Sequence, residues 1–158
     1  MSLKPLRIIS IGRIRMPFWR DASAYYLEKL SHWRKVTETV LKDAPAELPQ
    51  EQRARDESQR LAAAVEAGDF VICLDEKGSM MDSRAFSAFL ARISENAGMR
   101  PCFVVGGPYG LRDAILSKAK QSIAFGRQTL PHELARVLLL EQLYRAEAIA
   151  RNIPYHHD

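Results

Sequence analysis

The segment FVVGGPYGL at residues 103–111 is the first candidate for ligand binding, because its glycines directly follow an apolar run. A glycine-rich turn between a strand and a helix often binds the pyrophosphate of a dinucleotide. Here Gly106, Gly107 and Gly110 do not have the G-x-G-x-x-G spacing, and Pro108 lacks the N–H that an anion site would use. No Gly-Lys-Ser/Thr follows, as a P-loop would require. The segment therefore predicts a loop for a ligand that is not held by its phosphates.

A second candidate is the stretch GRQTLPHELAR, which begins at Gly126. Thr129 is suited to cap the helix that follows, and Pro131 is suited to its first turn. His132 is the titratable group in this stretch, and a helix N-terminus disfavours its cationic form. A histidine at such a position is either a surface or capping residue or a substrate contact. We assign no general base.

Arginines and aromatic residues alternate after the first predicted strand. Arg13, Arg15 and Arg20 flank Phe18 and Trp19. This mixture is suited to an RNA backbone with unpaired bases, and a solvated basic loop is the alternative.

The last predicted helix, from His132 to about Arg151, has an apolar surface wider than one stripe. Its apolar residues are Leu134, Val137, Leu138, Leu139, Leu140, Leu143 and Tyr144. This surface is buried either in the core of one chain or against a second subunit. Arg136 and Arg145 contact a substrate or pair with Glu133 or Glu141 on the same helix. Tyr155 and His156 lie in a terminal NIPYHHD that is either frayed or in contact with substrate.

The elements that must position these residues alternate along the chain. Apolar, β-branched runs predict strands at 6–11, 36–41, 70–74, 101–106 and 122–125. Helical spacing predicts helices over about 18–33, over 51–68 ending on Gly68, from Asp82 or Ser83 toward Gly98, over about 111–121, and over 132–151. This alternation predicts one α/β domain over 1–158 with a mostly parallel sheet flanked by helices. Ligands collect at the carboxyl ends of such strands, so GRIRMP, DEKG and GGPYG should converge there.

Composition agrees with a globular protein of 158 residues, with 47% hydrophobic and 27% charged residues. The net charge of +4 mildly favours a polyanionic partner. Cys73 and Cys102 lie in apolar runs, where a free thiol acts as a small core residue, and no metal site is predicted. We find neither a membrane-spanning run nor a signal peptide, so we expect a cytoplasmic protein.

Five blocks together resemble the RlmH family of SPOUT methyltransferases across nearly the whole chain. They are G-x-x-x-M-P-x-W from Gly12, L-D-x-x-G from Leu74, GGPYG, TLPHELAR with LLLEQLYRA, and a terminal PYH. The resemblance implies an α/β trefoil knot with S-adenosylmethionine bound in the knotted crossing. General topology rules disfavour knots, so this expectation comes from the resemblance alone. The family usually has Arg or Lys after the terminal histidine, whereas this chain has His157 and Asp158.

The resemblance also implies the site residues. Cofactor-binding residues would be Leu74, Gly106, Gly126, Arg127, Gln128, Thr129, Leu130 and Pro131. The terminal PYH of the family favours a tail in contact with RNA, and with the residue patterns above the candidate RNA-binding residues are Arg13, Arg15, His132, Arg136, Arg145, Tyr155 and His156. The implied activity is methylation of N3 of a pseudouridine in 23S ribosomal RNA, within the ribosome, by a homodimer. The alternatives are an RNA-binding protein without catalytic activity and, more remotely, a nicotinamide-dependent oxidoreductase, which the loop spacing opposes.

Overall fold

The computed structural model describes residues 3–157, which fold around one five-stranded sheet. In chain order the elements are β1 (Leu6–Ile11), α1 (Pro17–Ser31), β2 (Val36–Leu41), α2 (Gln50–Ala64), β3 (Asp69–Met80), α3 (Ser83–Glu95), β4 (Arg100–Val105), α4 (Asp113–Leu116), β5 (Gln121–Ala124) and α5 (His132–Ala150). The strand order is β2-β1-β4-β3-β5, and every pair is parallel. The predicted α/β class and parallel sheet are confirmed.

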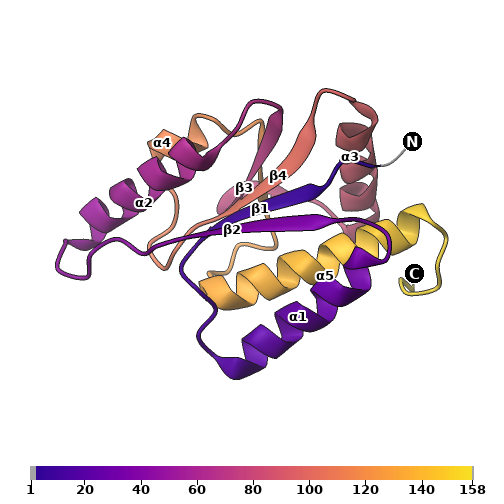
Figure 1. The fold of residues 1–158 in the computed structure, drawn as a ribbon, viewed down its shortest axis with the longest axis horizontal. Coiled ribbons are helices and arrows are strands. Elements are labelled where there is room, and N and C mark those ends of the chain that lie inside the picture. Colours follow the sequence, from indigo (N-terminus) through magenta and orange to yellow (C-terminus); the bar gives the residue numbers. More distant parts are fainter. Residues whose placement is uncertain (1–2, 158) are drawn as a thin grey trace.

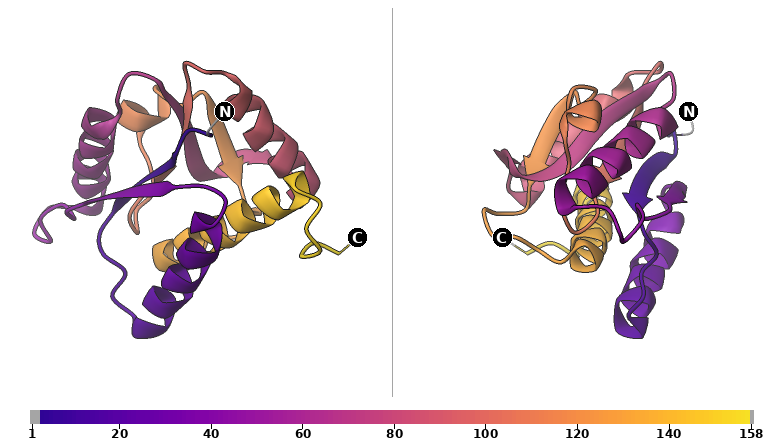
Figure 2. Two further views of the ribbon diagram at one scale, coloured as in Figure 1. Left: turned by 45° about the vertical axis from the view of Figure 1, so that its right-hand side comes forward. Right: turned by 90° about the vertical axis from the view of Figure 1, so that its left-hand side faces the viewer.

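Helices cover both faces of the sheet, as Figures 1 and 2 show. Helices α2 and α4 cover one face, and their core includes Ile9, Ile11, Leu61, Val104 and Ile115. Helices α1, α3 and α5 cover the other face, and their core includes Leu6, Phe86, Phe103, Leu139 and Leu143. Alternate strand residues thus point to opposite faces, which explains why the strands read as continuous apolar runs.

Helix α5 is buried on most of its circumference by the chain's own α1, α3 and sheet. Leu139 and Leu143 are fully buried, and Tyr144 is 8% exposed. Of the two interpretations of its wide apolar surface, burial in the core of one chain is therefore the one that the structure supports.

Two predicted helices are shorter than expected. The fourth ends at Leu116 rather than near residue 121, because the Lys120 N–H bonds to the Val71 carbonyl and draws the chain into β5. Helix α2 ends at Ala64 rather than at Gly68. There Arg7 donates to the Ala64 carbonyl, and the Asp69 carboxylate accepts the Glu66 N–H, which opens a turn.

The start of α3 and the course of β3 also follow from local chemistry. Asp82 is the cap of α3, with its carboxylate accepting the Ala85 N–H at 2.7 Å. Strand β3 continues beyond the predicted residue 74, with a register shift between Leu74 and Ser79. Cys73 and Cys102 are buried in the core, as predicted, and burial raises the pKa of each thiol to about 12. Within residues 3–157, no helix has both the length and the apolar content of a membrane span.

Candidate functional site

A cleft of about 470 Å³ opens at the carboxyl ends of β4 and β5, beside the middle of β3 where its pairing with β5 shifts register. Its walls are residues 74–77, residues 105–112 and parts of the segment 123–135. The predicted convergence of DEKG with GGPYG is therefore confirmed. The GRIRMP segment does not line this cleft, so that part of the expectation is wrong, and the segment lies beside it at the start of α5.

Six of the eight predicted cofactor residues line the cleft: Leu74, Gly106, Gly126, Gln128, Thr129 and Leu130. Arg127 and Pro131 do not. The Arg127 guanidinium instead donates to the backbone carbonyls of Glu76, at 2.6 Å, and Gly78, at 2.9 Å. The Arg127 side chain therefore stabilises the wall of the cleft and does not line the interior of the cleft.

The cleft walls after β3 and β5 are joined by side chains. The Thr129 hydroxyl donates to Glu76 Oε2 at 2.8 Å, next to the bonds from Arg127. The prediction that Thr129 caps α5 is wrong, because the helix begins only at His132 and Pro131 holds the cap position. Thr129 is thus free to connect the two walls.

Two glycines beside the cleft allow a backbone conformation and a close strand contact that other residues would prevent. Gly126 has φ = +143°, a conformation that side chains strongly disfavour. A Cβ on Gly78 would lie 2.6 Å from the Ile123 nitrogen, so β3 and β5 approach too closely there for any other residue. The glycine of L-D-x-x-G therefore serves close backbone packing beside the cleft.

Helix α2 supports the GGPYG loop from the side away from the cleft. The Arg53 guanidinium lies 5.0 Å from the centre of the Tyr109 ring. The Ser58 hydroxyl accepts the Arg112 N–H at 2.8 Å, and Glu51 forms an ion pair with the Arg112 side chain. The loop is therefore positioned by a helix that sequence patterns did not connect with the site.

His132 is half-buried and lines the cleft. Burial is the main cause that lowers the pKa of its imidazole, although the neighbouring Glu133 acts in the opposite direction. The neutral imidazole is therefore favoured at pH 7, so His132 is able to accept a hydrogen bond from a ligand.

The start of α5 holds the basic loop after β1. Arg136 is only 6% exposed and donates to the Gly12 carbonyl at 2.7 Å, rather than pairing with Glu133. Glu133 accepts the backbone N–H of Arg15. Arg13 and Arg15 are themselves exposed. Arg136 thus supports the loop whose arginines face solvent.

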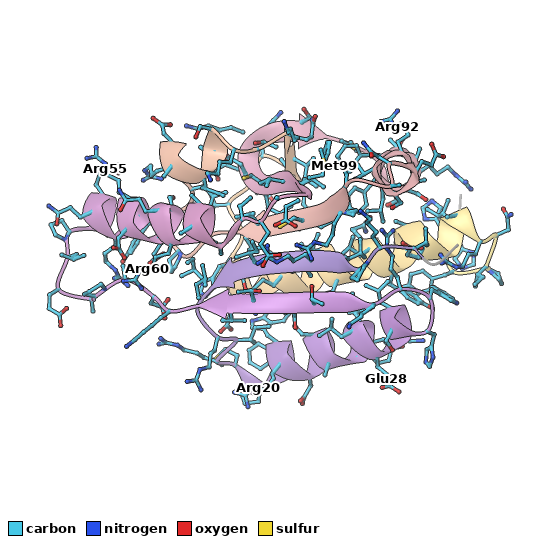
Figure 3. The ribbon with its side chains drawn as sticks, turned by 45° about the horizontal axis from the view of Figure 1, so that its top comes forward. Arg20, Glu28, Arg55, Arg60, Arg92 and Met99 are labelled. Atoms are coloured by element: carbon cyan, nitrogen blue, oxygen red, sulfur yellow. The ribbon has the colours of Figure 1, made fainter. Side chains whose placement is uncertain are left out.

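Other arginines lie farther out on the two faces. Figure 3 shows Arg20 on the outer side of α1 and Arg55 on the outer side of α2. Arg55 pairs with Glu51 one turn earlier, whereas Arg20 donates to the Arg15 carbonyl at 3.3 Å. Arg20 therefore extends the basic loop toward α1.

The residues after α5 turn back along that helix, as Figure 1 shows. The Tyr155 hydroxyl donates to Glu141 Oε1 at 3.0 Å, and the Tyr155 ring packs edge-on against Tyr144. Arg145 bonds to Glu141 and lies 3.1 Å from His156 Nδ1. The structure therefore favours an ordered tail over a frayed one, and Arg145 forms the predicted ion pair with Glu141.

A second hollow of about 600 Å³ adjoins the cleft, with which it shares Ala124, Phe125 and Gly126. His156 from the tail and Gln142 from α5 line it. Met80 and Phe125, also in its lining, are 58% and 36% exposed. The tail and the cleft thus meet at a partly apolar surface.

Sequence patterns missed several residues of the cleft. Asp75, Glu76 and Lys77 belong to a DEKG segment whose position was predicted but whose side chains were not assigned. Tyr109 and Arg112 also line the cleft. The available signal for Tyr109 and Arg112 was their position shortly after β4, whereas Asp75, Glu76 and Lys77 lie within β3, at its register shift against β5.

Comparison with known proteins identifies the family. Residues 5–156 match the family model described as "Predicted SPOUT methyltransferase". The chain is 52% identical, over 99% of its length and 100% of the relative's, to a Nitratidesulfovibrio vulgaris (strain DP4) protein named "Ribosomal RNA large subunit methyltransferase H". A Lawsonia intracellularis protein of the same name is 48% identical over 99% of this chain and 100% of its own length.

A solved structure agrees at the level of the fold. The probable methyltransferase from Bordetella pertussis Tohama I superposes with a TM-score of 0.60 at 12% identity, covering 92% of this chain and 96% of its own. The predicted SPOUT fold is confirmed. The chain belongs to the SPOUT methyltransferase family.

Proposed function

We propose that this protein methylates N3 of a pseudouridine in 23S ribosomal RNA, acting in the cytoplasm on the assembled ribosome. The observation that carries the proposal is the full-length similarity to relatives named as methyltransferases of the large-subunit ribosomal RNA. The trefoil knot remains a prediction from the family.

The chemistry of the cleft fits S-adenosylmethionine, which supplies an electrophilic methyl group on a positively charged sulfonium. Leu74, Leu111 and Leu130 offer apolar contacts, and the loop glycines allow close backbone approach. Two carboxylates, Asp75 and Glu76, stand in the lining against one lysine, Lys77, while Arg112 is already paired with Glu51. A cleft of this kind favours a cation over a phosphate.

The proposed RNA surface combines the second hollow, the tail and the basic loop. Tyr155 and His156 offer faces for stacking and polar atoms for an unpaired base. Arg13 and Arg15 supply exposed positive charge for phosphates. Arg145 holds Tyr155 and His156 in place, and the neutral His132 is positioned to accept a hydrogen bond at the cleft.

The direct experiment is methylation of ribosomes that lack this modification, followed by mass spectrometry of the digested nucleosides. We expect one methyl group on N3 of one pseudouridine. A methyl group on another base would contradict the proposed substrate. S-adenosylmethionine should bind in calorimetry, and failure to bind would favour an RNA-binding protein without catalytic activity.

Deletion of Tyr155 to Asp158 tests the tail. We expect S-adenosylmethionine affinity to stay within about twofold, since residues 155–157 do not line the cofactor cleft. Ribosome methylation should fall by roughly 100-fold, because the deletion removes a stacking and hydrogen-bonding surface. Methylation at the full-length rate would remove Tyr155 and His156 from the RNA surface.

We also propose a homodimer. Met16, Phe18 and Tyr25 near or on α1 are exposed, at 45%, 56% and 54%. Exposed apolar groups of this size are typical of association surfaces. Light scattering should give about twice the chain mass of 17.9 kDa. A monomer at micromolar concentration would contradict the proposal.

A further inference from the structure

Glu57 of α2 is a buried carboxyl group for which the proposed reaction has no role. The residue is 1% exposed and lies in the polar half of a surface helix. Its Oε1 accepts the Ala44 N–H at a long 3.4 Å. Its Oε2 has no hydrogen-bond partner among residues 3–157. A buried carboxyl oxygen without a partner is costly, so its retention suggests a purpose beyond packing.

This oxygen lies directly behind the cofactor cleft. A Cβ on Gly107 would be 2.5 Å from Glu57 Oε2, and Gly107 lines the cleft. The carboxyl group is therefore separated from the cleft by the thickness of the Gly106–Gly107 backbone. A residue with a side chain at position 107 would force the carboxyl group away.

The groups that face Glu57 leave its charge uncompensated. Asp43 and Asp56 are acidic, and Arg53, which acts on Glu57 in the opposite sense, forms its contacts with Tyr109. Burial is the main cause that raises the pKa of Glu57, and both aspartates add to the increase. The Ala44 N–H and Arg53 oppose it. A cation bound in the cleft would therefore be a new stabilising partner for the ionised carboxylate.

We propose that Glu57 is a positioning residue whose negative charge makes the cleft prefer the sulfonium cofactor over its neutral thioether product. The inference rests on the proposed cofactor site. Methyl transfer removes the positive charge from sulfur, so S-adenosylhomocysteine loses this attraction and leaves more readily. Glu57 thus promotes exchange of product for fresh cofactor without touching the reacting atoms.

The size of the effect follows from Coulomb's law. A single charge pair acting across the width of a small-molecule cleft, at an effective dielectric constant of roughly 20–40, changes affinity by about three- to thirtyfold. The affinity ratio of S-adenosylmethionine to S-adenosylhomocysteine isolates this term, because the two ligands differ only in the methyl group and its charge.

The test is calorimetry with both ligands on wild type, Glu57→Gln and Glu57→Asp. We expect Glu57→Gln to lower the preference for S-adenosylmethionine at least threefold and Glu57→Asp to retain most of it. Glu47→Gln is the matched control, because it removes the same charge from an exposed position and should leave the ratio unchanged. Circular dichroism checks that each variant is folded.

A pH series provides a second readout. Ionised Glu57 attracts the sulfonium, so the wild-type preference should increase as pH rises through the raised pKa of this group. The preference of Glu57→Gln should lack this increase. His132 is present in wild type and in Glu57→Gln, and the two ligands carry the same amino and carboxyl groups. The effects of these groups on the preference therefore cancel when the two proteins are compared.

Three results would overturn the inference. An unchanged ratio in Glu57→Gln at every pH would show that the charge is not felt in the cleft. An equal loss of affinity for both ligands would reduce Glu57 to a structural support for the loop. Failure of wild type to bind either ligand would overturn the proposed cofactor site itself. The wild-type measurements alone separate this outcome from a failure of the Glu57 proposal.

Discussion

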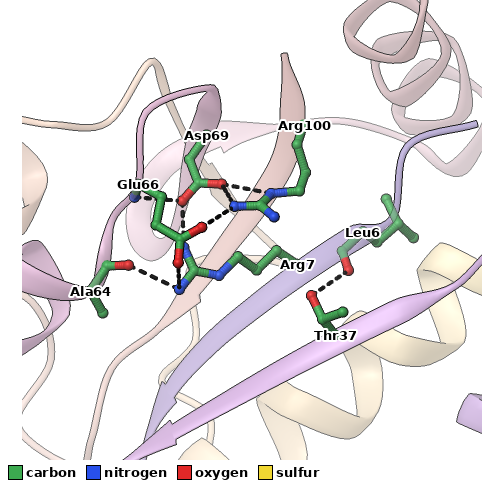
Figure 4. Close-up of polar contacts among 7 residues, drawn as sticks. All are labelled: Leu6, Arg7, Thr37, Ala64, Glu66, Asp69 and Arg100. Atoms are coloured by element: carbon green, nitrogen blue, oxygen red, sulfur yellow. Dashed lines mark hydrogen bonds and ion pairs between the residues drawn. The ribbon is translucent and has the colours of Figure 1, made fainter. Parts of the chain in front are cut away.

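The two ends of the strands are built in opposite ways. At the amino ends, Arg7 of β1, Asp69 of β3 and Arg100 of β4 meet Glu66 in a closed network of ion pairs, shown in Figure 4. At the carboxyl ends, loops diverge around an open cleft lined by Asp75, Glu76 and neutral His132. Charges are paired in a closed network at the amino edge, whereas carboxylates line an open cleft at the other edge.

The network at the amino ends satisfies its central carboxylate completely. The Asp69 side chain is fully buried and accepts hydrogen bonds from Arg7, Arg100 and the Glu66 N–H. Burial alone would raise the pKa of Asp69, but these partners together lower it. By contrast, burial prevails at Glu57, whose pKa is raised. The difference indicates that the amino edge contributes stability, whereas the carboxyl edge keeps groups poorly paired for binding.

The largest expected effect is at the amino edge. Asp69→Ala leaves Arg7 buried without its carboxylate and should destabilise the fold by about 3–5 kcal/mol. Urea denaturation measures this loss. The cofactor affinity of the folded fraction should be unchanged within about twofold. A large loss of affinity with intact stability would show that the amino edge serves binding rather than stability.

At the carboxyl edge, Gly106→Val should lower S-adenosylmethionine affinity by roughly 100-fold, or about 2.7 kcal/mol. A Cβ there would lie 2.8 Å from Leu111 Cδ2 and 3.3 Å from the Gly110 carbonyl carbon, so the loop must shift. Calorimetry measures the affinity, and circular dichroism should show a native-like spectrum. Wild-type affinity in the folded variant would remove Gly106 from the cofactor site.

Acid should weaken the amino edge. Because the folded-state pKa of Asp69 is lowered, its stabilisation is complete above the unfolded pKa of about 3.9 and is lost as pH falls through the folded value. Urea midpoints from pH 7 to pH 3 should therefore fall less steeply in Asp69→Asn than in wild type. Equal slopes would show that other carboxylates cause the acid sensitivity.

The smallest effect concerns the link between the cleft walls. Thr129→Val removes the hydroxyl that donates to Glu76 and should weaken S-adenosylmethionine binding by about two- to tenfold. Thr37→Val is the matched control, because its hydroxyl donates at 3.5 Å to Leu6 at the opposite edge, as Figure 4 shows. If calorimetry gives the two variants equal affinities, the Thr129 link has no role in binding.

The five parallel strands and five helices were predictable because apolar periodicity is a local property that burial of the sheet enforces. The ends of α2 and α4 were not, because Arg7 and Val71 set them from distant parts of the sequence. Likewise, the two walls of the cleft followed from the rule that ligands bind beyond parallel strands. The side chains of Asp75 and Glu76 were overlooked although they line one of these walls.

The sequence by itself determined the class of fold, the two glycine-containing segments of the cleft and, through its five blocks, the family. These depend on residue type and spacing along the chain. The tertiary structure alone decided that Arg136 supports the β1 loop, that α5 is buried within one chain and that Glu57 lies behind Gly107. Each of these depends on contacts between residues at least 50 positions apart or on burial by several elements, which no local pattern encodes.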